Sequence, residues 1–139
     1  MQKLIYLDTN IYLDYLENRT DRLRPLGEFA FRLIKRTIDC EFNVAVSSLV
    51  LAEIKFNNYT KQFTDLINSL KDMNKIVYIE MNENDNLKAR KFHKERKTSF
   101  NDTLHVVLAN KVNAILITRN LKDFEELQDL IEISLPENL

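Results

Sequence analysis

The sequence predicts an α/β fold in which helices cover both faces of a central, mostly parallel sheet of about five strands, forming a three-layer α/β/α sandwich. Two observations lead to this prediction. Short apolar segments rich in β-formers alternate along the chain with longer amphipathic segments of helical period. The 139 residues include one glycine and two prolines, too few for the tight hairpins of an all-β protein. A chain of this length is expected to form one domain, residues 1–139.

Five segments have the composition of buried strands, and helical patterns separate them. The predicted strands are 4–7, 43–46, 76–79, 114–117 and a weaker edge strand at 131–133. The predicted helices are 11–17, 25–38, 49–56, 60–73, 83–97, one that restarts at 99–101 and continues to 112, and 121–127. Ser47-Ser48 offers an N-cap for the third of these helices. The alternation places the carboxyl ends of the strands along one rim of the sheet.

Composition and charge exclude several classes of protein. The net charge of −1 does not by itself indicate a nucleic-acid binder, although basic residues crowd the segment 88–97. The single cysteine, Cys40, excludes an internal disulfide and a cysteine-based zinc site, and we expect it in the core. No apolar run approaches the ~18 residues of a membrane span, and the first residues lack a signal-peptide pattern. We therefore expect a cytoplasmic protein that does not associate with membranes.

Four acidic residues are expected at the carboxyl rim of the sheet. Asp8 follows the first strand, Asp123 follows the fourth, and Glu53 and Asp102 lie near the beginnings of helices. Taken singly, Asp8 could cap a helix, Asp102 could complement a helix dipole and Glu53 could reach solvent. Taken together, clustered carboxylates repel one another unless a cation lies between them. Such oxygen ligands suit Mg²⁺ or Mn²⁺, so the sequence indicates a divalent metal site.

Four motifs, in this order along the chain, resemble those of PIN domains and in particular the small nucleases typified by VapC-type toxins. The motifs are Leu7-Asp8-Thr9-Asn10, Ser47 with Glu53-Ile54, Asn101-Asp102 with His105 and Ala109, and Ile117-Thr118-Arg119-Asn120 with Asp123-Phe124. The resemblance spans residues 4–124 and implies a PIN-like α/β/α fold and a metal-dependent ribonuclease. It further implies that Asp8, Glu53 and Asp102 are the principal catalytic and metal-binding acids.

The resemblance leaves the fourth acid open between two positions. We favour Asp123 as the fourth catalytic and metal-binding acid, with Asn120 as a neutral ligand or hydrogen-bonding group. The bound ion would activate a water for in-line attack on a phosphodiester, and Asp123 could help to hold a second ion. By analogy with the family, cleavage would leave a 5′-phosphate and a 3′-hydroxyl.

Other residues are placed to contact the substrate. Asn10 and Thr118 could orient waters or phosphate oxygens, and Arg119 is either a contact to the phosphate backbone or an ordinary surface arginine. The basic segment 88–97 is either a source of phosphate contacts or a solvated helix face. His105 shares a helical face with Asp102, and we expect it to be packed or solvent-facing rather than a metal ligand.

We expect an endoribonuclease that is the toxin of a type II toxin–antitoxin pair, with RNA as substrate, a homodimeric state and a cognate antitoxin. The alternatives are a housekeeping RNA-processing PIN nuclease and a non-catalytic PIN-like domain that binds RNA or protein. A haloacid-dehalogenase-type phosphotransferase also begins with a strand and an aspartate, but it needs a second aspartate where this chain has Asn10. A flap-type DNA nuclease needs additional acids and helical insertions that 139 residues hardly accommodate.

Overall fold

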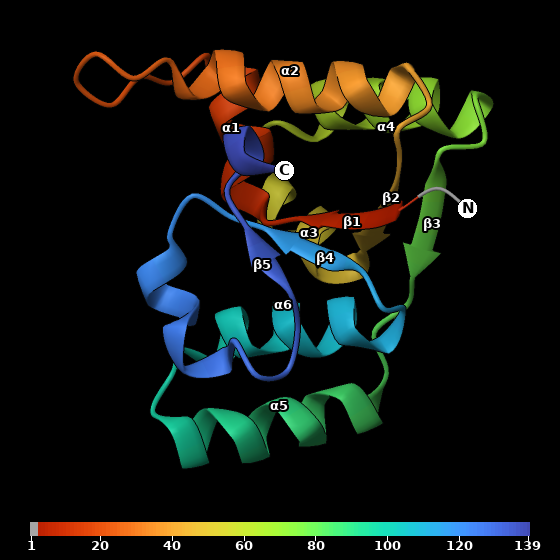
Figure 1. Ribbon diagram of the computed structural model, residues 1–139. Coiled ribbons are helices and arrows are strands. Elements are labelled where there is room, and N and C mark those ends of the chain that lie inside the picture. Colours follow the sequence, from red (N-terminus) through yellow and green to blue (C-terminus); the bar gives the residue numbers. More distant parts are fainter. Residues whose placement is uncertain (1–2) are drawn as a thin grey trace.

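The computed structural model describes residues 3–139, in which strands and helices alternate (Figure 1). The strands are β1 Lys3–Leu7, β2 Phe42–Ser47, β3 Ile76–Ile79, β4 Ile115–Ile117 and β5 Ile133–Ser134. The helices are α1 Thr9–Glu17, α2 Leu26–Ile38, α3 Ser48–Phe56, α4 Thr60–Asp72, α5 Glu83–Arg96 and α6 Phe100–Lys111, with the 3-10 helices η1 Leu121–Leu127 and η2 Pro136–Asn138. The predicted fold class, a parallel sheet between helices, is confirmed.

The sheet has the strand order β3-β2-β1-β4-β5, and its strand pairs are parallel. β1 lies at its centre, where Ile5 pairs with Val44 of β2 on one side and with Ile115 of β4 on the other. A strand covered on both faces and both edges needs apolar residues throughout, which explains the unbroken apolar run of β1. The chain moves outward from β1 in opposite directions toward β2 and β4. The carboxyl end of β1 is therefore the topological switch point, where open α/β sheets bind ligands.

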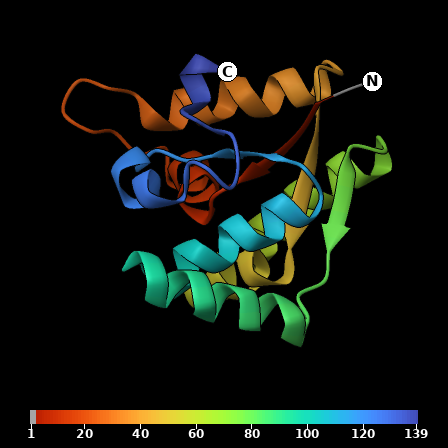
Figure 2. The same cartoon turned by 60° about the horizontal axis from the view of Figure 1, so that its bottom comes forward.

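Helices form a layer on each side of the sheet (Figures 1 and 2). α1, α2 and α4 lie on one side, and α6 lies on the other with α5 packed outside it. α6 is thus enclosed between the sheet and α5, which explains why every residue from 103 to 109 is buried. None of the helices in the described part of the chain is long and apolar enough to cross a membrane.

Polar side chains fix the points at which helices begin. Ser47 is the N-cap of α3, where its Oγ accepts a hydrogen bond of 3.2 Å from the backbone N–H of Val50. Ser99 caps α6 in the same way. Asn82 and Asp85 form a reciprocal capping box at the beginning of α5. These caps determine where the polar residues of α3 and α6 lie relative to the sheet.

Two predictions were wrong in detail. The edge strand is Ile133–Ser134 rather than 131–133, because Ile131 turns into the core before pairing with β4 begins. Cys40 is exposed rather than in the core, since it follows α2 in the left-handed region, with φ of 73°.

Candidate active site

Asp8 stands at the switch point, directly after β1 and at the N-cap of α1. Its backbone N–H donates a hydrogen bond of 2.9 Å to the carbonyl of Ile117, the last residue of β4. Its side chain accepts a hydrogen bond of 3.0 Å at Oδ2 from the hydroxyl of Thr118. Asp8 is only 5% exposed, so the ends of the two central strands hold a nearly buried carboxylate in one position.

Burial raises the pKa of Asp8, and the neighbouring charge of Glu53 raises it further. His105 and the hydroxyl of Thr118 act in the opposite direction, and they only partly compensate. The fold therefore places Asp8 where its negative charge is disfavoured. A carboxylate maintained in such a position is typical of a functional site rather than of a structural one.

Glu53 lies on α3 with its side chain 29% exposed. Two groups contact the same oxygen, Oε1: the hydroxyl of Thr9 donates to it at 2.8 Å and His105 Nε2 lies 2.6 Å from it. Burial opposes the charge of Glu53, but its hydrogen bonds with His105 and Thr9 outweigh burial and lower its pKa. Glu53 is thus held as a carboxylate with one oxygen fixed.

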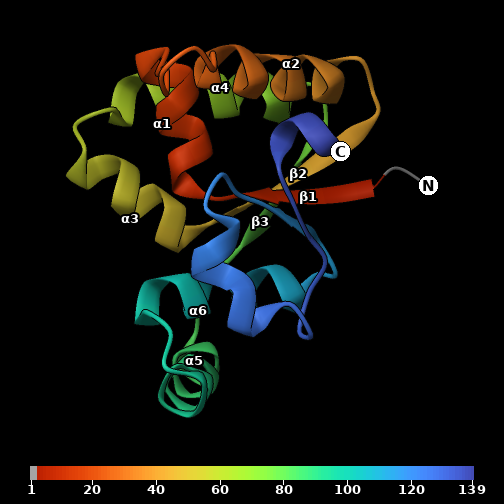
Figure 3. The same ribbon diagram turned by 60° about the vertical axis from the view of Figure 1, so that its left-hand side comes forward.

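Asp102 lies in the first turn of α6, where its backbone N–H donates to Ser99 Oγ at 3.1 Å. Burial raises its pKa, and repulsion from Asp8 and Asp123 adds to the effect, whereas Ser99 and His105 lower it. Asp123 itself is exposed on η1. Figure 3 shows α1, α3 and η1 leaving the same end of the sheet. The acids from four separate segments therefore influence one another at this rim.

Arg119, Asn10 and Asn120 lie beside this rim, around a cavity of about 340 Å³. The Arg119 side chain is only 10% exposed, because its Nη1 donates to the carboxylate of Glu137 at 2.7 Å and its guanidinium lies over the ring of Phe29. Asn10 and Asn120 reach the same cavity from the beginning of α1 and from the end of the loop after β4. Thr118, also predicted to contact substrate, donates its hydroxyl proton to Asp8.

The family model of the PIN domain matches residues 5–130 of the chain. The chain belongs to the PIN domain family. Solved structures with the same fold as this PIN domain include VapBC-1 from nontypeable Haemophilus influenzae (20% identity, TM-score 0.64, covering 96% of this chain and 98% of that one). VapBC2 from Rickettsia felis, bound to a DNA fragment from its promoter, is 18% identical with a TM-score of 0.67, covering 95% and 98%.

FitAcB from Neisseria gonorrhoeae is 16% identical to this PIN domain with a TM-score of 0.63, covering 97% of this chain and 99% of that one. Comparison with curated proteins found no match. The family match and these likenesses confirm the predicted PIN-type sandwich over nearly the whole chain.

PIN domains generally use divalent metal ions, and the donor chemistry of this one fits such an ion. Asp8, Glu53 and Asp102 offer carboxylate oxygens, and the mutual repulsion of Asp8 with the other two would be relieved by a cation. Within residues 3–139, no three His, Cys, Asp or Glu side chains already lie close enough to form a metal-binding group.

His105 is the site residue that sequence reasoning missed in this PIN domain. It is 1% exposed, as expected for a packed histidine, and what the sequence did not indicate is its direct contact with Glu53. The available signals were its position three residues after Asp102 and its place among the apolar residues Leu104, Val106, Val107 and Leu108. Neither signal could identify its partner, because Glu53 is 52 residues away in sequence.

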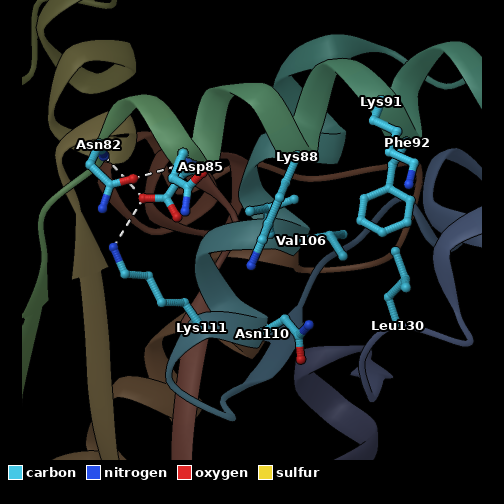
Figure 4. A pocket seen from close by; sticks show the side chains of 11 residues that line it. Asn82, Asp85, Lys88, Lys91, Phe92, Val106, Asn110, Lys111 and Leu130 are labelled. Atoms are coloured by element: carbon cyan, nitrogen blue, oxygen red, sulfur yellow. Dashed lines mark hydrogen bonds and ion pairs between the residues drawn. The ribbon is translucent and has the colours of Figure 1, made fainter.

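The basic segment 88–97, expected either to contact phosphates or to be a solvated helix face, lies largely on α5, and a cavity of about 560 Å³ runs between α5 and α6 (Figure 4). At one end of this cavity Lys111 pairs with Asp85 at 3.0 Å. Lys88 and Lys91 line the cavity, and the ion pairs found among residues 3–139 do not engage either of them. Phe92 lies beside them in the same groove. Part of this basic segment is therefore free to meet a negatively charged ligand.

Proposed function

We propose that this PIN domain is a divalent-metal-dependent endoribonuclease that hydrolyses RNA phosphodiester bonds, and that it is the toxin of a type II toxin–antitoxin pair. One observation carries the proposal. Acids from different segments influence one another's pKa near the carboxyl end of the central strand, where Asp8 is nearly buried and its charge is disfavoured by burial and by Glu53. A buried charge of this kind destabilises the fold, and proteins keep such a charge where it binds a cation or takes part in a reaction.

Asp8, Glu53 and Asp102 would hold Mg²⁺ or Mn²⁺, with Asp123 as a fourth acid for a second ion. Bound there, the metal would lower the pKa of a water and stabilise negative charge on the phosphate oxygens. The residues of the chain keep the acids in place: Thr118 fixes Asp8, while Thr9 fixes Glu53. Cleavage is proposed to leave a 5′-phosphate and a 3′-hydroxyl.

RNA would approach across surfaces that bear free donors. Lys88 and Lys91 would contact phosphates from the groove beside α6, and most nucleic-acid affinity comes from contacts of this kind. Asn10, Asn120 and Arg119 would orient the strand next to the acids, from the cavity that they share. The unpaired bases of a loop would suit such an open rim better than a duplex would.

The assignment as a toxin is supported by the structures that share the fold. They include a toxin–antitoxin complex from Klebsiella pneumoniae, with 18% identity and a TM-score of 0.61, as well as the VapBC and FitAcB structures above. We propose a cognate antitoxin, a homodimeric state and a cytoplasmic location for this chain. Co-purification with the product of an adjacent small reading frame tests the antitoxin, and light scattering of the purified protein tests the dimer. A housekeeping RNA-processing nuclease and a non-catalytic binding domain are the alternatives.

The nuclease proposal is tested with purified protein, a mixture of structured RNAs and single-stranded DNA, in Mg²⁺, Mn²⁺ or EDTA. We expect RNA cleavage that EDTA and Asp8→Asn abolish. Asp65→Asn changes an exposed acid on α4 and is the matched control, which should cleave like the wild type. Cleavage that persists in EDTA or in Asp8→Asn would contradict the proposal. Binding of RNA without cleavage in any condition would favour the non-catalytic alternative.

A further inference from the structure

A chain of buried hydrogen bonds runs from the cap of α3 to Glu53. The hydroxyl of Ser47 lies 2.7 Å from Tyr6 Oη, and Tyr6 Oη lies 2.6 Å from His105 Nδ1. The other ring nitrogen of His105, Nε2, lies 2.6 Å from Glu53 Oε1. Ser47, Tyr6 and His105 are at most 1% exposed, so water cannot substitute for any of these partners. The four residues come from β1, β2, α3 and α6.

The positions of the protons determine which group donates in each bond of this series. Ser47 Oγ already accepts the N–H of Val50, so its own proton is free to donate to Tyr6 Oη. The Tyr6 proton then goes to His105 Nδ1, and the proton on Nε2 goes to Glu53. Each group gives one proton and no donor faces another donor. In the reverse direction the Ser47 proton would have no acceptor among the contacts of the described residues.

The other neutral form of His105 is also disfavoured. A proton on Nδ1 would leave a lone pair on Nε2 facing the Glu53 oxygen at 2.6 Å. Oε1 of Glu53 already accepts the hydroxyl proton of Thr9 at 2.8 Å, and a carboxylate oxygen can only accept, so Nε2 must carry the proton. With His105 in the Nε2–H form, every donor in this series of hydrogen bonds faces an acceptor.

We propose that Ser47 and Tyr6 fix His105 as its Nε2–H tautomer, and that His105 is a positioning residue that holds Glu53 by Oε1. Thr9 donates to the same oxygen, so two donors fix Oε1. Tyr6 would thereby affect a reaction that it does not touch. The tautomer is independent of the proposed function, whereas the effect on catalysis rests on it.

The other histidine of the protein, His93, serves as a reference for the tautomer. His93 is the second of the two histidines, and its Nδ1 contacts the backbone carbonyl of Thr98. A carbonyl oxygen can only accept, so the proton of His93 must be on Nδ1. The two histidines are therefore expected to be opposite tautomers in one molecule.

Nitrogen-15 NMR of the histidine rings tests the tautomer directly, at a pH about two units above the usual histidine pKa of ~6.5. His105→Gln assigns the two sets of signals by removing one. We expect the Nε2–H pattern for His105 and the Nδ1–H pattern for His93. In Tyr6→Phe, the His105 pattern should change and that of His93 should not. A proton on His105 Nδ1 in the wild type, alone or together with one on Nε2, would overturn the proposal.

Kinetics test the positioning role. Tyr6→Phe removes one hydroxyl and should lower kcat for RNA cleavage about 10-fold to 100-fold, with KM within about twofold. Tyr12→Phe is the matched control, because Tyr12 is equally buried and its hydroxyl has no hydrogen-bond partner among the residues described. It should cleave like the wild type.

Two substitutions of His105 complete the test. His105→Leu should lower kcat at least as much as Tyr6→Phe does. His105→Gln keeps an N–H donor where Nε2 lies, and it should recover most of the activity. Equal losses in the two variants, measured on protein whose thermal unfolding shows it folded, would leave His105 a packing residue and overturn its positioning role. If the wild type cleaves no RNA, the proposed function fails, while the NMR pattern still decides the tautomer.

Discussion

Replacing Asp8 by Asn is predicted to abolish activity and to stabilise the protein. The nearly buried carboxylate is disfavoured by its burial first and by Glu53 second, and Asn removes the charge while keeping an oxygen that can accept from Thr118. The substitution therefore relieves an unfavourable charge without losing the hydrogen bond that joins the ends of β1 and β4.

The expected gain is about 1–2 kcal/mol in the free energy of unfolding at neutral pH, within the usual range for a single stabilising substitution. For a domain of 139 residues it corresponds to a rise of about 3–7 °C in Tm. The gain depends on pH. Because the folded-state pKa of Asp8 is raised, the folded protein binds more protons than the unfolded chain between ~3.9 and that raised value. The unfavourable contribution of Asp8 to wild-type stability therefore fades as the pH falls through this window, and the advantage of Asp8→Asn should disappear near about pH 4.

Thermal unfolding of the wild type and of Asp8→Asn, at neutral pH and near about pH 4, measures both effects. Addition of Mn²⁺ at about ten times its Kd should stabilise the wild type by about 1.4 kcal/mol and leave the variant unchanged. A variant that is less stable than the wild type at neutral pH would refute the reasoning. In that case Asp8 would be a structural link between the central strands, and its charge would be part of what holds them.

Three further predictions follow from the same structure. Replacing Lys88 and Lys91 together by Glu should raise KM for RNA and reduce the slope of log affinity against log salt concentration by about 0.7 per lost phosphate contact. Lys61→Glu on α4 is the control and should change neither quantity, so equal effects in both variants would mean that only net charge matters. Ser99→Ala removes the N-cap of α6 and should lower the free energy of unfolding, measured by chemical denaturation, by about 1 kcal/mol. Activity should also fall because the first turn of α6 frays, and unchanged stability would contradict the capping role. Tyr12→Phe removes a buried hydroxyl that has no hydrogen-bond partner among the described residues, so the free energy of unfolding should stay unchanged or rise by about 1 kcal/mol. A clear decrease would mean that the hydroxyl makes a hydrogen bond in solution.

The parallel sheet could be predicted because its central strands are apolar on both faces and because the chain lacks residues for tight turns. Local patterns of this kind carry enough information to place β1 to β4 and the helices between them. β5 was harder to place. It has only Ile133 and Ser134, and its pairing with β4 is set by where η1 ends rather than by its own composition. Cys40 was misplaced because its left-handed backbone follows from the end of α2, which periodicity does not fix.

The candidate site was predictable to the extent that it depends on strand order. Asp8 could be placed because it directly follows a strand, and a carboxylate at the switch point of a parallel sheet has few other uses. His105 could not be found in the same way, because its role comes from contacts with Tyr6 and Glu53, 99 and 52 residues away. Long-range hydrogen bonds between buried side chains leave no periodic trace in a sequence. The surroundings of Arg119 were equally hidden, since Glu137 reaches it from the last turn of the chain.

The most direct test of the central claim is an anomalous-scattering measurement on crystals of the protein soaked in Mn²⁺. The structure predicts a peak at the carboxyl end of β1, bounded by Asp8, Glu53 and Asp102, and absent from crystals of Asp8→Asn. A peak elsewhere, or the absence of any peak at Mn²⁺ concentrations that support RNA cleavage, would contradict the proposal that these acids hold the catalytic ion.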